Sequence, residues 1–383
     1  MIRQNFNADW TVEKGDGNSR MNSFLGNTQT QTVHLPYDAM IHEARTPDTK
    51  NGAQTGFYPG GEYIFQKHFT APQAWQGKPV SLVFEGVYQT ALVYLNGWLL
   101  TRNVNGYAEF TVEADPYLKY GADNLLKVIA DNSLEPNSRW YTGSGIYRPV
   151  RLLVGNKVYL PQDTVRITTR EVGEGFALVD VTAQVQSASA VTERVTLQQT
   201  ICREGMAVLT DRQNLLLQPG ESRIVSFRYC VDSPALWSPE NPNLYTSTMQ
   251  VLEGEEELDR EETSFGIRTL SIDASHGVRI NGQTVKLRGA CIHHDNGILG
   301  AATLPDAEER RIRQLKEAGF NAIRSSHHPA GRALLDACDR YGVLVMDELS
   351  DVWNVRKNPY DYALYFEQDW KPTIQKMVAK DYN

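Results

Sequence analysis

VKLRGACIHHD (residues 285–295), NAIRSSHHP (residues 321–329) and VLVMDE (residues 343–348) are three apolar runs that pass directly into polar residues. Short buried strands of this kind, separated by amphipathic helices, are typical of parallel βα units. In a βα barrel, the polar residues just past the strand ends face the active site. The three runs therefore predict the start of a (β/α)8 TIM barrel with a functional site at its strand ends.

The segments between and after these runs have helical periodicity. One helix is predicted to begin at Pro305 and to end at Gly319. Two further apolar stripes predict helices whose apolar faces lie in the core: Leu334, Leu335, Cys338 and Tyr341, and then Trp370, Ile374, Met377 and Val378. Only about three βα units fit, whereas a closed barrel needs eight. We therefore expect the chain to be the front portion of a larger enzyme, with residues 269–383 as a truncated barrel.

The first 268 residues are expected to form two β domains. Residues 1–155 contain many short β-rich runs that end in Gly or Asn-Gly turns, which favours a jelly-roll sandwich. Residues 156–268 contain longer strands in which apolar and polar residues alternate, which favours an immunoglobulin-like sandwich. The predicted fold is thus multidomain.

Bulk properties exclude several classes of partner. A formal net charge of -8 argues against nucleic acid or an anionic membrane as the main partner. No apolar run approaches the roughly 18–20 residues of a membrane span, and the first residues do not begin a signal peptide. The four cysteines form no CxxC pair, so we expect reduced and mostly buried thiols in a cytoplasmic protein.

The strand ends offer His293, Arg324 with His327, and Asp347 with Glu348. These groups supply the donors and acceptors that fix sugar hydroxyls, and His and Arg also stabilise charge that develops during bond cleavage. One alternative is that they only cap strands and helices. Another is a metal site built from His293, His294, Asp295, His327 and Glu348. No dense ligand motif on one element supports a metal, so none is expected.

The segment from Asn321 to Pro329, with the apolar run that follows, resembles the first signature of glycoside hydrolase family 2. The resemblance extends to RWYTGSGIYRPV (residues 139–150) and SFGIR (residues 264–268), and it spans nearly the whole chain. The family includes β-galactosidases, β-glucuronidases and β-mannosidases. It implies a jelly-roll domain, an immunoglobulin-like domain and a (β/α)8 barrel, in that order.

The resemblance also implies roles for individual residues. His293 is similar to the first-strand His beside the sugar, and His327 to the second-strand His that contacts the sugar near the transition state. Arg324 is similar to the Arg that supports the catalytic carboxylates. Asp131 resembles, more loosely, an Asp that the first domain sends into the sugar pocket, and the alternative is a turn-capping Asp.

Three more substrate-binding candidates come from DELSDVW (residues 347–353), which resembles a stretch of many family members: Glu348, Asp351 and Trp353. This stretch lacks the acid and His that some β-galactosidases use for magnesium, so magnesium is not expected there. Retaining glycosidases use two carboxylates about 5–5.5 Å apart. In the family both are Glu on later barrel strands, and neither position falls within these 383 residues.

The sequence therefore indicates the N-terminal portion of a retaining hydrolase of terminal β-galactosides, inactive by itself and without a cofactor. Galactoside is preferred because residues 351–353 and 360–362 look like the β-galactosidase branch. The alternatives are a β-glucuronidase fragment and a non-catalytic carbohydrate-binding or assembly module. The expected partners are a β-linked sugar and either further copies of the chain or a missing C-terminal portion.

Overall fold

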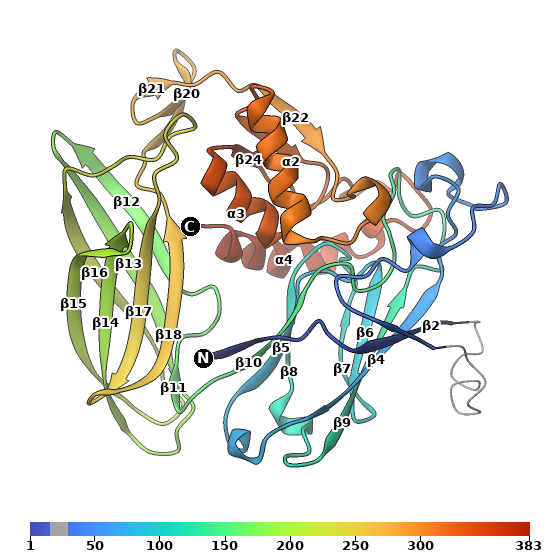
Figure 1. Cartoon of the computed structure of the whole chain (residues 1–383), viewed down its shortest axis with the longest axis horizontal. Coiled ribbons are helices and arrows are strands. Elements are labelled where there is room, and N and C mark those ends of the chain that lie inside the picture. Colours follow the sequence, from blue (N-terminus) through green and yellow to red (C-terminus); the bar gives the residue numbers. More distant parts are fainter. Residues whose placement is uncertain (16–29) are drawn as a thin grey trace.

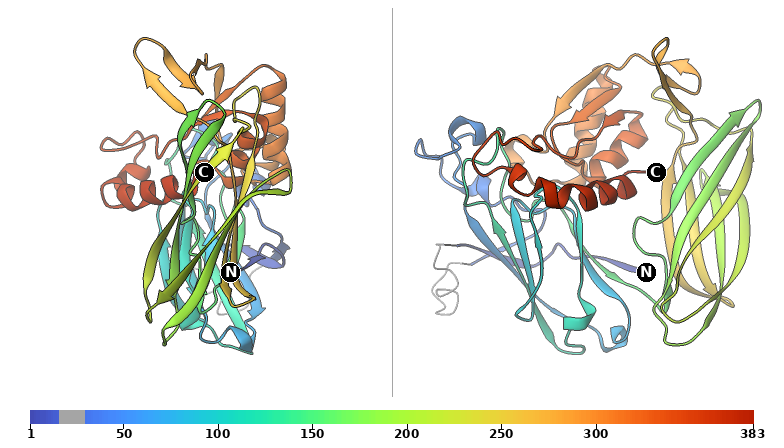
Figure 2. Two further views of the ribbon diagram at one scale, coloured as in Figure 1. Left: turned by 90° about the vertical axis from the view of Figure 1, so that its left-hand side faces the viewer. Right: turned by 180° about the vertical axis from the view of Figure 1, so that it is seen from behind.

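The computed structural model describes residues 1–15 and 30–383, which form two β-sandwiches and one smaller α/β unit (Figure 1). The α/β unit lies on one end of the first sandwich, and the second sandwich stands to its side. Figure 2 shows the same arrangement from behind, with both termini in the space between the sandwiches. The expected order of two β domains followed by βα units is confirmed.

The first sandwich packs a six-stranded sheet against a four-stranded sheet, both antiparallel. The larger sheet has the order β3 (Gln31–Val33), β2 (Trp10–Lys14), β4 (Glu62–Thr70), β9 (Asp123–Asp131), β6 (Thr90–Leu95) and β7 (Trp98–Asn103). The smaller sheet has the order β1 (Ile2–Asn5), β10 (Val150–Val154), β5 (Val80–Phe84) and β8 (Phe110–Glu113). In β9 the buried side chains Asn124, Leu126 and Val128 alternate with partly exposed ones. Successive side chains of a strand point to opposite faces of the sheet, so this alternation places one face of β9 against the core.

The second sandwich also has two antiparallel sheets. One contains β11 (Val158–Tyr159), β13 (Phe176–Ser187), β12 (Arg166–Gly173) and β16 (Ser222–Asp232). The other contains β15 (Met206–Leu217), β14 (Glu193–Arg203), β17 (Tyr245–Glu253) and β18 (Glu256–Phe265). Its core is separate from that of the first sandwich, so each sandwich has its own hydrophobic centre.

The α/β unit begins after a small sheet of β19 (Leu270–Asp273), β20 (Gly277–Ile280) and β21 (Gln283–Thr284). Its parallel sheet has the order β22 (Gly289–Ile292), β23 (Ala322–Ser325) and β24 (Leu344–Met346). The helices are α2 (Pro305–Glu317), α3 (Arg332–Tyr341) and α4 (Phe366–Lys380). The short 3-10 segments are η1 (Met40–His42), η2 (Gly52–Thr55), η3 (Gln73–Trp75), η4 (Asp115–Tyr117), η5 (Gly297–Leu299) and η6 (Tyr362–Leu364). In the described part of the chain, no helix has the length and apolarity of a membrane span.

Three expectations about burial are wrong. The predicted buried strand from Val285 starts only at Gly289, so Leu287 precedes it and is exposed, and β22 itself has no buried residue because it is an edge strand of the three-stranded sheet. The third helical stripe is not a core face: Trp370 and Val378 are exposed on α4. Among the cysteines, only Cys338 is buried, and all four are free thiols.

Candidate functional site

The three parallel strands end side by side, and polar residues gather where they end. His293 follows β22, Arg324 lies in β23, His327 follows β23, and Asp347 and Glu348 follow β24. Because β23 pairs in parallel with both neighbours, the carboxyl ends of all three strands meet at one edge. This is the edge at which barrel enzymes place their active sites.

Glu348 joins the second and third strand ends. Its Oε1 accepts a hydrogen bond from Arg324 Nε, and its Oε2 lies 2.9 Å from His327 Nδ1. The hydrogen bond from Arg324 to Glu348 raises the pKa of the guanidinium. Because Nδ1 faces a carboxylate, Nε2 is the nitrogen of His327 that remains to meet a ligand.

Loops of the first sandwich insert aromatic rings at this edge. Trp140 stacks on His293 with ring centroids 5.3 Å apart and an interplanar angle of 17°. The centroid of Trp140 is also 5.5 Å from that of His327. Tyr107 accepts a 3.0 Å hydrogen bond from Trp140 Nε1 and stacks on His328 with centroids 4.4 Å apart. We call this contact between sandwich rings and strand-end histidines the aromatic seam.

The second histidine of each strand-end pair is buried. His294 Nε2 lies 2.9 Å from the carbonyl oxygen of Thr142 and donates to it. Burial lowers the pKa of His294 to about 3, and burial also holds the pKa of His328 well below its usual value. Both rings are therefore neutral and belong to the packing of the seam.

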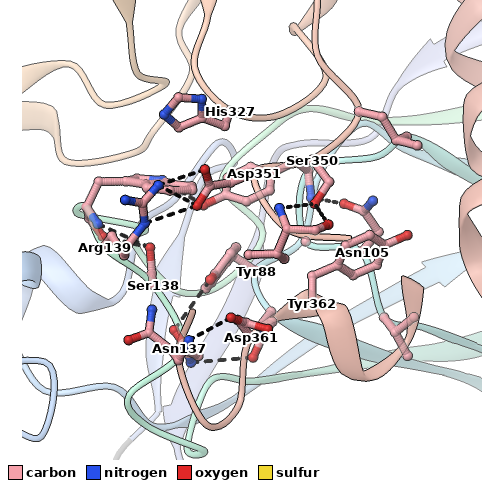
Figure 3. Close-up of a pocket in the computed structure, with 18 residues that line it drawn as sticks. Tyr88, Asn105, Asn137, Ser138, Arg139, His327, Ser350, Asp351, Asp361 and Tyr362 are labelled. Carbon is pink, nitrogen blue, oxygen red and sulfur yellow. Dashed lines mark hydrogen bonds and ion pairs between the residues drawn. The ribbon is translucent and has the colours of Figure 1, made fainter. Parts of the chain in front are cut away.

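A cavity opens beside His327, between the first sandwich and the segment after β24 (Figure 3). Its volume is about 50 Å³, which is room for a few water molecules and less than a pyranose ring fills. Its polar lining includes Asn105, Asn137, Ser138, Arg139, Ser350, Asp351, Asp361 and Tyr362. The cavity is therefore too small to enclose a pyranose ring.

An ion pair crosses the cavity from one domain to the other (Figure 3). Arg139 donates to Asp351 through Nε at 3.1 Å and through Nη2 at 2.7 Å, and Lys357 Nζ donates to the same carboxylate at 2.8 Å. Burial would raise the pKa of Asp351, but the hydrogen bonds from Lys357 and Arg139 outweigh it and lower the pKa. Asp351 is thus ionised and links the segment after β24 to the first sandwich through an ion pair.

The structure brings most of the predicted site residues together. His293, Arg324, His327 and Glu348 surround the strand ends, and Asp351 lines the adjoining cavity. Trp353 is not in the cavity lining, and 66% of its surface is exposed.

Asp131 is not among the residues that line the cavity. Its Oδ1 accepts hydrogen bonds from Ser133 N at 3.0 Å and Ser133 Oγ at 2.6 Å, as the turn-capping alternative requires.

Asp131→Ala should therefore change stability by no more than about 1 kcal/mol, the size of one such local hydrogen bond. In an active form of the enzyme, its kcat/KM should stay within about threefold of the wild-type value. Urea unfolding and steady-state kinetics measure both quantities. A loss of more than about tenfold in kcat/KM would instead place Asp131 in the sugar pocket.

Sequence reasoning assigned no role to Tyr107, Trp140 and Arg139. Trp140 and Arg139 stand in the motif of residues 139–150, but the motif by itself does not say which side chains reach the strand ends. Tyr107 has no local signal for a role at the strand ends, because the histidines that its ring contacts, His294 and His328, are more than 180 positions away in the chain. Among the described residues, no group of three or more His, Cys, Asp or Glu side chains is arranged to hold a metal ion.

Comparison with known families gives three consecutive matches along the chain. The galactose-binding domain-like model of glycosyl hydrolase family 2 matches residues 10–165. The glycosyl hydrolases family 2 model matches residues 158–268, and the TIM barrel domain model of the family matches residues 273–374.

Individual relatives are similar over the whole chain. A β-galactosidase of Bacteroides ovatus is 36% identical over 382 residues, which is 100% of this chain and 45% of that protein. The structure of a glycosyl hydrolase family 2 member from Bacteroides cellulosilyticus aligns with a TM-score of 0.95 at 36% identity, covering 100% of this chain and 50% of that one. A Bacteroides uniformis β-glucuronidase aligns with a TM-score of 0.85 at 26% identity, covering 100% of this chain and 45% of that one. The chain spans about half the length of these relatives.

Proposed function

The chain belongs to glycoside hydrolase family 2, and we propose on this premise that it is the N-terminal portion of a retaining enzyme that cleaves terminal β-galactosides. The observation that carries the proposal is the linked set of Arg324, Glu348 and His327 at the ends of parallel strands. The similarity to a β-galactosidase over the full chain supports the choice of sugar.

The proposed substrate-binding residues fall into two groups. His293 and His327 would bind sugar hydroxyls, with Arg324 and Glu348 fixing the orientation of His327. Asp351 and the exposed ring of Trp353 would border the sugar, because an aromatic face packs well on a sugar ring. Asp131, whose Oδ1 accepts from Ser133, would join them through its Oδ2. We propose no cofactor, a cytoplasmic location, and assembly with further copies or with a C-terminal portion.

This 383-residue chain by itself should not turn over a glycoside. At the described strand ends both oxygens of Glu348 are engaged by Arg324 and His327, and Oδ1 of Asp347 accepts from the backbone N–H groups of Ala330 and Glu348, so at most one carboxylate there, that of Asp347 through Oδ2, has a free oxygen. A retaining mechanism needs one free nucleophile and one acid/base group. Hydrolysis of a nitrophenyl β-galactoside, in protein made in a host without a galactosidase, measures this directly. Turnover above a blank would show that the chain carries its own catalytic pair.

The proposed activity is tested on the product of the complete reading frame. It should hydrolyse the nitrophenyl β-galactoside, and NMR should show the β-anomer of galactose as the first product. A β-glucuronidase is the second candidate, supported by the alignment with a β-glucuronidase. Preference for the glucuronide would establish that candidate, and binding without hydrolysis of either substrate would indicate a non-catalytic module.

A further inference from the structure

We infer that Trp140, a residue of the first sandwich, is a positioning residue for His293 and, together with Glu348, for His327 at the barrel strand ends. The sugar-binding role of these histidines rests on the proposed function, whereas the ring contacts described below do not depend on any activity. Positioning by Trp140 makes the first sandwich a working part of the site and not an accessory module.

His293 needs a positioning group because its own ring has little else to orient it. Among the described residues, its buried Nδ1 has no hydrogen-bond partner. Arg311 contacts His293 only through the backbone, donating to its carbonyl oxygen at 2.7 Å. An imidazole is usually oriented by a hydrogen bond from one nitrogen, and here the near-parallel indole of Trp140 takes that place.

The same indole reaches the second histidine. The centroid of His327 is 5.5 Å from that of Trp140, and the rings of His293 and His327 lie 6.0 Å apart at an interplanar angle of 72°. The three rings therefore form one cluster in which a shift of Trp140 moves both histidines. His327 is additionally held by Glu348, so it should depend on Trp140 less than His293 does.

Trp140 is itself fixed from the first sandwich. Its Nε1 donates to the hydroxyl of Tyr107 at 3.0 Å, and Ser138 Oγ donates to its carbonyl oxygen at 3.0 Å. Tyr107 is in turn locked by stacking on His328, and its carbonyl oxygen accepts from Arg148 Nη1 at 2.8 Å. Trp140 is thus held once at its ring and once at its backbone, and such fixing preorganises a positioning group.

The test follows the histidine rings directly by NMR of this chain with 13C-labelled histidine. The chain has eight histidines, and His293→Gln and His327→Gln variants assign the two signals. The stacked indole should shield the ring proton of His293, so Trp140→Leu should move its signal downfield. The His327 signal should move less. Trp140→Phe, which keeps a ring, should retain part of the shielding.

Two matched variants separate positioning from general damage. Trp98→Leu removes an exposed tryptophan of the same sandwich and should leave both signals unchanged. Tyr107→Phe removes only the hydroxyl that holds Nε1 and should move the His293 signal without unfolding the chain. If Trp140→Leu does not fold, Trp140→Phe and Tyr107→Phe decide the question by the same signals. An unchanged His293 signal in the folded Trp140 and Tyr107 variants overturns the inference.

Kinetics of the complete enzyme provide a second readout. Trp140→Leu should lower kcat by about tenfold or more, since misplaced groups lose transition-state contacts, while KM changes by less than about threefold. Trp140→Phe should restore part of kcat. An unchanged kcat would show that the ring contact has no part in turnover and would overturn the positioning role. Absence of activity in the wild-type enzyme, with the NMR shifts as expected, would instead contradict the proposed function alone.

Discussion

Between pH 7 and pH 4, the titration of His294 alone should remove about 3 kcal/mol from the free energy of unfolding. Burial lowers the folded-state pKa of His294 to about 3, whereas an unfolded histidine titrates near 6.5. The unfolded chain therefore binds a proton over this range and the folded chain does not. The stability from the neutral ring is complete above the unfolded pKa and is lost as the pH falls toward the folded pKa. His328 acts in the same direction.

The structural reason is the position of His294 in the aromatic seam. Its Nε2–H is already given to the carbonyl oxygen of Thr142, and Nδ1 has no partner among the described residues. A second proton would place a charge among the rings of Tyr107 and Tyr147. The positive charge of Arg148 disfavours that proton further.

Urea unfolding of the wild type and of His294→Gln, at both pH values, measures the effect. The amide of Gln keeps a donor for Thr142 but does not titrate, so the variant should lose about 3 kcal/mol less between the two pH values. Carboxyl titrations are common to both proteins and cancel in the difference. His68→Gln replaces an exposed histidine that pairs with Asp123 and is the control for the substitution itself. Equal pH dependence in the wild type and His294→Gln would mean that His294 is protonated within the fold.

Arg332→Met should destabilise the chain by about 3–5 kcal/mol, the usual result of removing one partner of a buried ion pair. Arg332, in the first turn of α3, donates to Glu109 through Nε at 2.8 Å and through Nη2 at 2.7 Å, and to Asp163 at 2.6 Å. Glu109 belongs to the first sandwich, and Asp163 lies on the connection to β12 of the second. One guanidinium therefore joins all three parts of the chain.

The size of this effect follows from the burial of Glu109. Burial would raise the pKa of its carboxyl, but Arg332 and Arg151 outweigh burial and hold the pKa below its usual value. Without Arg332, Glu109 must either take up a proton or remain charged with only its weaker partners, Arg151 and Gln162. Both outcomes weaken the contact that Arg332 makes between α3 and the two sandwiches.

Thermal and urea unfolding measure the loss, and two variants control for side effects. Arg340→Met, on the same helix, breaks an exposed pair with Glu309 and should cost less than about 1 kcal/mol. Adding Glu109→Gln to Arg332→Met should recover part of the loss, because no buried charge is then left unpaired. If Arg332→Met is no less stable than Arg340→Met, the packing of α3 on the two sandwiches does not depend on this ion pair.

The strand ends were predictable because their signal is local. An apolar run followed by His, Arg or Glu predicts a strand and shows which of its ends carries the polar residues. Four predicted residues do lie together at these ends: His293, Arg324, His327 and Glu348. The aromatic seam was not predictable, since no local period relates Tyr107 or Trp140 to histidines far along the chain. The third helix shows the opposite error, because a helical stripe predicts an apolar face but does not say whether a partner covers it.

The aromatic seam has a consequence for how this family can be recombined. The rings that orient the strand-end histidines come from loops at residues 104–109 and 136–148 of another domain. A chimera that joins the first sandwich of one relative to the barrel of another would exchange these rings along with the sandwich. Parents for such chimeras should therefore be matched at Tyr107 and Trp140 before they are matched at the domain boundary. In this architecture a chimera should take the barrel and the sandwich loops that contact it from the same parent.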